Sequence, residues 1–233
     1  MAKIRVMCAR SMHKAVETLT GEFDKRTGHE VALDFGTVGA LEGKIAAGEI
    51  ADVMILSLPA IGKLKAAGLI DAGTQANVAR TSIGVAVRAG AVVPDIATAE
   101  AFKRLLLNAQ AVAFSDAAVG GSAGVYLAGL FERMGLSAAI KEKGMPQQSG
   151  AEVARRVAEG KAEIGLTLIG EIVPIAGVTI AGPLPPPLGN DTTYCAAVAV
   201  ASKERPVALA FIAALTAPAT RPVWQTAGFD LPA

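Results

Sequence analysis

Hydroxyl-bearing and small residues recur at four positions along the chain where a helix is predicted to begin. These segments read RSMH (10–13), GTVGA (36–40), GGSAG (120–124) and QSGAE (148–152), and three of them directly follow a predicted strand. The N-terminus of a helix presents unpaired N–H groups and the positive end of the helix dipole, so it can hold an anion without a cationic side chain. The four segments therefore predict an anion site if they meet in the fold. Each single Ser or Thr is alternatively an ordinary helix cap.

The first of these segments adds a cation and a titratable group to the hydroxyl. Arg10 offers a planar fork that suits a carboxylate, although an arginine at this position is alternatively a solvated surface residue. Ser11 is a candidate ligand residue or a helix cap. If the protein is an enzyme, a general base is needed within reach of the ligand, and the candidates are His13 and Glu171.

The sequence lacks the motifs that several other kinds of chemistry require. The sequence has no G-x-S-x-G elbow, phosphate-binding P-loop or G-x-G-x-x-G fingerprint. Two histidines and two cysteines, with no Cys/His cluster, predict no metal site, and we predict no cofactor. Cys8 and Cys195 lie in apolar runs typical of buried free thiols, and a disulfide between them is the alternative.

The net charge and the hydropathy of the chain limit the classes of partner and the cellular location that we expect. The net charge is +1 and the basic residues are scattered, so we predict no nucleic-acid partner. No apolar run reaches the roughly 18 residues of a membrane span, so we predict no membrane insertion. The N-terminus does not read as a signal peptide. The protein is therefore expected to be cytoplasmic as the sequence stands, or periplasmic if a signal peptide has been removed.

The elements that must position these residues alternate along the chain. Short β-rich runs at 4–8, 31–35 and 51–57 are each followed by a helical pattern, and further strands are predicted at 81–90, 111–116, 164–169 and near 192–202. This order predicts an α/β protein with a parallel sheet covered on both faces. The proline-rich stretch near 183–189 is expected to be a loop or a sheet edge.

The order of the segments resembles the molybdate-binding protein family of type II periplasmic solute-binding proteins. The resemblance runs through GEFDKRTGHEVALDFGTVGALEGKIAAGEIADVMILS, SDAAVGGSAGVYLAGLFERMG, VARRVAEGKAEIGLTLI and FIAALTAPATRPVWQTAGF, and covers nearly the whole chain. It implies two three-layer α/β lobes joined by two crossover strands, with a ligand cleft between them. Lobe one would comprise residues 1–80 and 181–233, and lobe two residues 81–180.

The resemblance also implies a ligand set, which this sequence only partly keeps. Ser11 matches the family's first serine ligand, whereas the second falls at Val38, beside Thr37. The tyrosine of the molybdate site falls at Leu168, beside Thr167. Backbone N–H groups are implied at Ala123, in the loop that contains Ser122 and Gly124, and at Gly150, beside Ser149. The predicted ligand-binding set is Arg10, Ser11, Thr37, Val38, Ser122, Ala123, Gly124, Ser149, Gly150 and Thr167.

Two functions remain open at this stage. The altered donors and Arg10 favour a solute-binding protein that takes an organic di- or tricarboxylate over one that takes molybdate or tungstate, with an ABC permease as partner if it is exported. The alternative is a metal-free enzyme similar to aconitate isomerase, which would catalyse a 1,3-proton shift on an unsaturated tricarboxylate. Fold resemblance alone does not choose between them.

Overall fold

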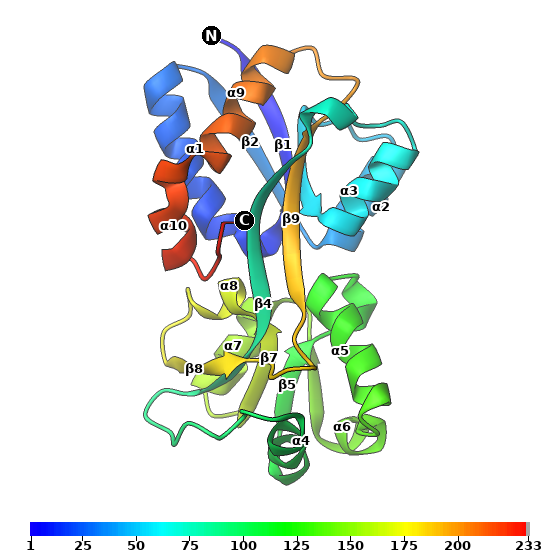
Figure 1. Cartoon of the computed structure of the whole chain (residues 1–233), viewed down its shortest axis with the longest axis vertical. Helices are drawn as coiled ribbons and strands as arrows, with labels where there is room; N and C mark the ends of the chain where they lie inside the picture. The colour runs from blue at the N-terminus through cyan, green and yellow to red at the C-terminus, as the bar shows by residue number, and fades with distance from the viewer. Residues whose placement is uncertain (232–233) are drawn as a thin grey trace. The chain divides into compact units, whose positions relative to one another are not determined.

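The computed structural model describes residues 1–231, and the chain forms two compact units (Figure 1). Unit 1 comprises Met1–Arg80 and the segment that begins at Thr192, and unit 2 comprises Thr81–Asp191. The chain passes between the units twice, within strand β4 (Ala76–Arg88) and at the start of strand β9 (Asp191–Val198). The second boundary lies later than the expected 180/181, because strand β8 (Val178–Pro183) pairs with β4 inside unit 2.

The sheet of unit 1 has the strand order β2-β1-β3-β9. Strand β1 (Lys3–Ala9) is parallel to both β2 (Glu30–Gly36) and β3 (Val53–Ser57), as the alternating pattern predicted. Strand β9 runs antiparallel to β3, so the prediction of a wholly parallel sheet is wrong at this strand. The reversal arises because β9 enters unit 1 from the second crossing and not through a β-α-β connection.

Helices cover both faces of the unit 1 sheet (Figure 1). Helices α1 (His13–Thr27), α9 (Arg205–Thr216) and α10 (Arg221–Thr226) lie together on one face, where Phe23 and Phe211 pack edge to face with ring centroids 5.3 Å apart. Helices α2 (Val38–Ala46) and α3 (Leu58–Ala66) cover the other face, over a core that includes Met7, Leu41 and Leu56. Both faces of the strands are therefore apolar, as the continuous hydrophobic runs predicted.

The sheet of unit 2 contains β8, β4, β7, β5 and β6 in that order. Strand β5 (Val112–Ser115) is parallel to β6 (Gly144–Gln147) and to β7 (Ile164–Leu168). Strand β4 is antiparallel to β7 and β8, so this sheet is also mixed. Strand β8 was not predicted, whereas the proline-rich stretch that follows it is a loop, one of the two expected outcomes.

Helices again flank the sheet of unit 2 (Figure 1). Helix α7 (Gly150–Ala158) packs on β5 and β7 together with the four-residue helix α8 (Ile169–Ile172). Helix α5 (Ser122–Arg133) contacts the same two strands and also α6 (Ser137–Lys143). Helix α4 (Ala99–Asn108) buries Phe102 and Leu106.

Both cysteines are free and buried, as predicted from their apolar surroundings. Burial raises the pKa of the Cys8 thiol far above its ordinary value, and raises the pKa of Cys195 to about 11. Thiolates are the reactive form of cysteine, so neither side chain is suited to nucleophilic chemistry.

In the described part of the chain, no individual helix is both long and apolar enough to cross a membrane. One bent pair, Arg205–Thr216 with Pro218–Thr226, passes that test jointly by length and composition.

Candidate functional site

Two of the four predicted segments lie at one edge of the unit 1 sheet. Because β1 and β2 are parallel and in register, Ala9 pairs with Gly36, and each strand ends directly at a predicted segment. Arg10 and Ser11 follow Ala9, and Thr37 follows Gly36. The carboxyl edge of parallel strands is the place where open α/β sheets bind ligands.

Ser11 is held by a long-range hydrogen bond and does not cap the helix. Its hydroxyl donates to the Oη of Tyr194 over 2.7 Å. Residues Arg10–Met12 form a short 3-10 helix, and α1 begins only at His13 with Met12 as N-cap and no side-chain capping bond. The alternative prediction that Ser11 is a helix cap is therefore wrong. The 3-10 turn moves the N-cap of α1 from Ser11 to Met12, one residue later.

The other two candidate residues of this segment, Arg10 and His13, face solvent. Arg10 is exposed and makes no hydrogen bond or ion pair to any residue of the described range. His13 has a half-exposed side chain whose Nε2 lies 3.1 Å from Glu17 Oε1, and its ring packs edge-on against Phe35. His13 thus has a partner one helical turn ahead, while the guanidinium of Arg10 remains available to a ligand.

The second segment is built as a helix start. Thr37 is the N-cap of α2, and its side-chain oxygen accepts a 3.2 Å hydrogen bond from Ala40 N. Val38 packs against the apolar core beneath α2. Of the two residues, Val38 offers only its backbone, and the hydroxyl of Thr37 already accepts one bond.

Sequence reasoning missed two hydroxyl groups at this edge. Ser57 is the last residue of β3 and is buried, and its register partner on the antiparallel β9 is Tyr194. Tyr194 is 1% exposed, yet its hydroxyl meets Ser11. Ser57 could have been identified from the sequence, because it ends a predicted strand and is followed by Pro59 in the first turn of α3. The pairing of β9 with β3, which brings Tyr194 to that edge, has no local signal.

The other two segments lie at one edge of the unit 2 sheet. The last residues of the parallel strands β5 and β6, Ser115 and Gln147, are register partners. The loop after β5 leads to Ser122, the first residue of α5, whose N-cap is Gly121. Ala123 and Gly124 are buried. A Cβ on Gly124 would lie 2.4 Å from the carbonyl oxygen of Asp116, so a glycine is required where α5 crosses the end of this strand.

The segment after β6 forms the predicted cap. Ser149 is the N-cap of α7 and accepts a 3.3 Å hydrogen bond from Glu152 N. Glu152 Oε2 in turn accepts from Gln148 N over 3.1 Å, one residue before the position of a strict capping box. The Ser149 hydroxyl is thus used by the helix itself.

The predicted backbone donor at Gly150 already has a carboxylate partner. Gly150 N donates to Glu171 Oε1 over 3.3 Å, and Thr167 Oγ1 donates to Glu171 Oε2 over 3.1 Å. Thr167 is fully buried, and its hydroxyl also lies 2.8 Å from Ser115 Oγ. The structure therefore brings three predicted residues, Gly150, Thr167 and Glu171, into one hydrogen-bonded group, together with Ser115, which sequence reasoning did not select.

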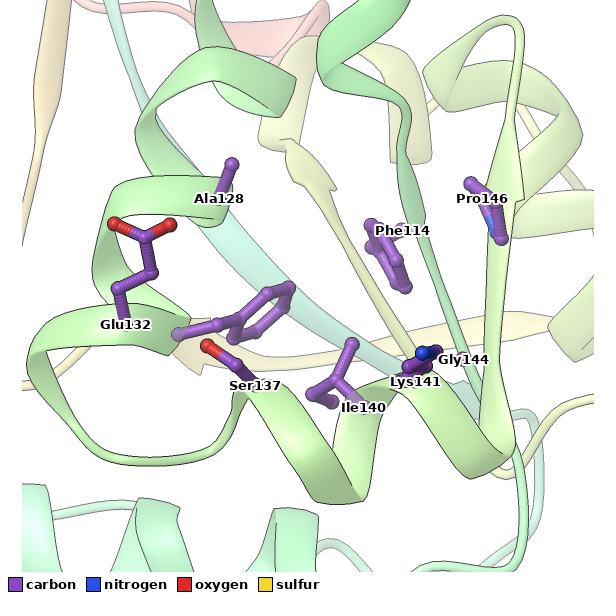
Figure 2. A pocket seen from close by; sticks show the side chains of 9 residues that line it. Phe114, Ala128, Glu132, Ser137, Ile140, Lys141, Gly144 and Pro146 are labelled. Atoms are coloured by element: carbon purple, nitrogen blue, oxygen red, sulfur yellow. The ribbon is translucent and has the colours of Figure 1, made fainter.

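A hollow elsewhere in unit 2 lies away from the predicted residues (Figure 2). It has a volume of about 330 Å³ and an apolar lining that includes Phe114, Phe131 and Ile140, with Glu132 and Lys141 also on its wall. None of the predicted site residues lines it. Within residues 1–231, no group of three or more His, Cys, Asp or Glu side chains is placed to hold a metal ion.

Comparisons with known proteins agree with this architecture. The chain is 31% identical over 220 residues to an aconitate isomerase from a Pseudomonas species, covering 90% of this chain and 80% of the relative. It is 25% identical over 241 residues to the molybdate-binding protein ModA of Azotobacter vinelandii, covering 99% and 90% of the two chains.

Among solved structures, the substrate-binding domain of a putative molybdenum ABC transporter from Clostridium difficile aligns over 100% of both chains. Its TM-score is 0.79 at 18% identity, which establishes a shared α/β fold. A family model described as bacterial extracellular solute-binding protein matches residues 4–230. The chain therefore belongs to the bacterial extracellular solute-binding protein family.

Proposed function

We propose that this protein binds a small organic di- or tricarboxylate. The observation that carries this proposal is the turn after β1. There an exposed, unpaired guanidinium on Arg10 stands next to a hydroxyl that Tyr194 holds in place. A guanidinium fork matches the geometry of a carboxylate.

The donors that remain argue against molybdate as the ligand. A tetrahedral dianion needs several hydrogen-bond donors, and each partner that is lost costs about 1–3 kcal/mol. Thr167 donates its proton to Glu171, and Val38 supplies no side-chain donor. The relatives' names support both ligand classes, since one is an aconitate isomerase and the other a molybdate-binding protein.

The fold family supports a transport role for this binding. A structural neighbour is the substrate-binding domain of a putative ABC transporter, and the family is described as extracellular. We therefore propose an ABC permease as the partner and the periplasm as the location.

A ligand panel tests the binding proposal. Citrate, trans-aconitate and tricarballylate are compared with molybdate, tungstate and sulfate by thermal denaturation. A ligand at 100 times its Kd adds about 2.7 kcal/mol, which raises the Tm of a chain of this size by about 5–10 °C. We expect this rise with at least one carboxylate. A rise with molybdate or tungstate alone would refute a carboxylate ligand.

Arg10→Ala tests the residue, and Arg26→Ala is its matched control. Arg26 lies at the other end of α1 and is also exposed and unpaired in the described range. Loss of a charge-assisted hydrogen bond lowers affinity by about 10- to 100-fold. We expect that loss in Arg10→Ala and none in Arg26→Ala, measured by calorimetry. Equal affinities in the two variants would place Arg10 outside the site.

A second candidate function is isomerisation of aconitate. The relative with 31% identity favours it, and Glu171 supplies a half-buried carboxylate at the edge of unit 2. In a 1,3-shift the base would take a proton from the methylene carbon of trans-aconitate and return one to the alkene carbon. Proton NMR of trans-aconitate in D₂O would show deuterium uptake and cis-aconitate with the wild type but not with Glu171→Gln. No exchange with the wild-type protein would exclude this function.

A further inference from the structure

Ser57 is a buried serine at the carboxyl edge of unit 1 whose hydroxyl has no partner in the described part of the chain. It is the last residue of β3 and is 8% exposed. It is also the N-cap of α3, yet its side chain makes neither a capping bond nor any other hydrogen bond within residues 1–231. An N-cap serine ordinarily accepts a bond from the first turn of its helix, and buried polar groups are nearly always hydrogen-bonded. The Ser57 hydroxyl is therefore a group in need of a partner.

The oxygen of Ser57 is open to solvent although the residue is buried. Among the described residues, the side-chain oxygens that are both fully covered and unpaired are Thr20 Oγ1 and Asp24 Oδ1. Ser57 Oγ is unpaired but is not one of these two, so it keeps an exposed surface. A molecule in solution can therefore reach this hydroxyl and complete its hydrogen bonds.

Strand register places Ser57 beside the turn after β1. Strands β1 and β3 are parallel neighbours in which Cys8 pairs with Ile55, and Arg10 and Ser57 each follow two residues later. Neighbouring strands lie about 4.8 Å apart. The unpaired guanidinium and the unpaired hydroxyl thus belong to adjacent strand ends of the same unit.

The bond between Ser11 and Tyr194 crosses the end of the strand that carries Ser57. Strand β3 lies between β1 and β9, and this bond joins the turn after β1 to β9. Tyr194 is the register partner of Ser57, and opposed residues of an antiparallel pair point to the same face of the sheet. Ser57 therefore extends the row of hydroxyls that begins at Ser11.

The two helices that begin beside these strand ends carry no group that would repel an anion. Helix α1 begins after Met12 and α3 after Ser57, both without a side-chain cap and without an acidic residue in the first turn. An uncapped first turn leaves N–H groups without a side-chain partner and places the positive end of the helix dipole at the sheet edge. The surroundings of Ser57 thus favour an anion over a cation or an apolar group.

We propose that Ser57 is a further ligand-binding residue, whose hydroxyl donates a hydrogen bond to the anion that Arg10 holds. This inference rests on the proposed function, in which Arg10 binds a di- or tricarboxylate. An ionised carboxylate only accepts hydrogen bonds, so the serine is the donor. The bond supplies the partner that Ser57 lacks in the ligand-free chain.

Ser57→Ala distinguishes a ligand contact from a structural role. The hydroxyl makes no hydrogen bond within the described chain, so its removal should leave the Tm of the ligand-free protein within about 2 °C of the wild type. Calorimetry with citrate, trans-aconitate and tricarballylate should show an affinity about 10- to 100-fold lower for each that binds the wild type.

Thr98→Ala is the matched control, because Thr98 is an N-cap that does cap its helix. Its oxygen accepts a 3.1 Å hydrogen bond from Ala101 N at the start of α4. Loss of such a cap should lower the Tm by about 2–4 °C and leave the affinity unchanged. The two variants should therefore show opposite patterns in the two measurements.

Ser57→Cys tests whether the hydroxyl or the space it fills is responsible. A thiol is a weak donor that occupies a similar volume. The affinity of Ser57→Cys should fall with that of Ser57→Ala. Wild-type affinity in Ser57→Cys would mean that packing and not the hydroxyl matters, and would overturn the assignment.

The remaining outcomes separate this inference from the proposed function. If a carboxylate binds the wild type and Ser57→Ala keeps its affinity, Ser57 is not a ligand residue and the proposed function stands. If molybdate or tungstate alone binds and Ser57→Ala weakens that binding, the anion contact of Ser57 is supported and the carboxylate ligand is refuted. Binding of none of these anions would overturn both.

Discussion

The hydroxyl of Ser11 donates a 2.7 Å hydrogen bond to the hydroxyl of Tyr194, across 183 positions of sequence. The bond joins the turn after β1 to strand β9, and it leaves the start of α1 without a side-chain cap. Ser11 is thus positioned by tertiary structure, with its other lone pairs available at the carboxyl edge of the sheet.

Replacement of Tyr194 by Phe should weaken ligand binding and stability together. The variant removes the acceptor for Ser11, which costs about 1 kcal/mol of unfolding free energy. An unrestrained Ser11 should lower carboxylate affinity by about fivefold to tenfold. Urea denaturation and calorimetry measure the two effects.

Tyr126→Phe is the matched control for this prediction. Its hydroxyl donates to the Leu188 carbonyl over 3.0 Å within unit 2. A similar stability loss with unchanged affinity is expected. Equal affinity losses in both variants would mean that the Tyr194 effect is not specific to Ser11.

Replacement of Gly150 by Ala should destabilise unit 2 and displace Glu171. The new Cβ would overlap Thr167 Oγ1 and Glu171 Oε2, and overpacking of this kind costs about 1–3 kcal/mol. Thermal denaturation should show a lowered Tm. Gly121→Ala is the control, because Gly121 has φ −75° and no atom within 4 Å of an added Cβ. A wild-type Tm in Gly150→Ala would contradict the packing described above.

Asp34 should contribute stability that depends on pH. The hydrogen bond from Lys44 is the main cause that lowers the pKa of the Asp34 carboxyl, and Arg5 adds to it. A carboxyl whose folded pKa lies below its unfolded value of about 3.9 stabilises the protein above that pH and loses the effect as pH falls through the folded pKa. The pairs are partly exposed, so the contribution is at most about 1 kcal/mol.

Asp34→Asn measures this contribution. Urea denaturation should show the variant less stable than the wild type at pH 7, with the difference fading between about pH 4 and pH 2. Glu142→Gln, which alters an exposed carboxyl without a partner in the described range, should show no such trend. A difference that grows as the pH falls would have the wrong sign for this ion pair.

The fold could be predicted from sequence to a considerable extent, because its signals are local. Alternating apolar runs and helical patterns indicated the α/β class, and the segment QSGAE (148–152) predicted a helix start that is the start of α7. The direction of each strand in its sheet was harder to predict from the sequence than the type of each element. Nothing within 191–198 shows that β9 lies antiparallel to β3, because the direction depends on how the chain returns from unit 2.

The candidate site could be predicted only as a set of strand ends. Arg10, Ser11 and Gly150 were selected because they precede helices near strand ends, and their role in a site stays a prediction. Tyr194 was missed, since its residue type and its position in an apolar strand both favour simple packing. Glu171 was considered only as a general base, and its contact with Gly150 had no sequence signal.

The sequence by itself indicated most of the strands and the helix caps at Thr37 and Ser149, although it did not predict strands β6 and β8. Such features depend on hydrogen bonds between residues three or four positions apart, as at Thr37 and Ser149. Only the tertiary structure decided which polar groups form hydrogen bonds over long separations in sequence. Ser11 with Tyr194, Ser115 with Thr167, and Glu171 with Gly150 meet through strand register and helix packing. A hydrogen bond requires atoms within about 3 Å, and over long separations in sequence only the packed fold fixes that distance.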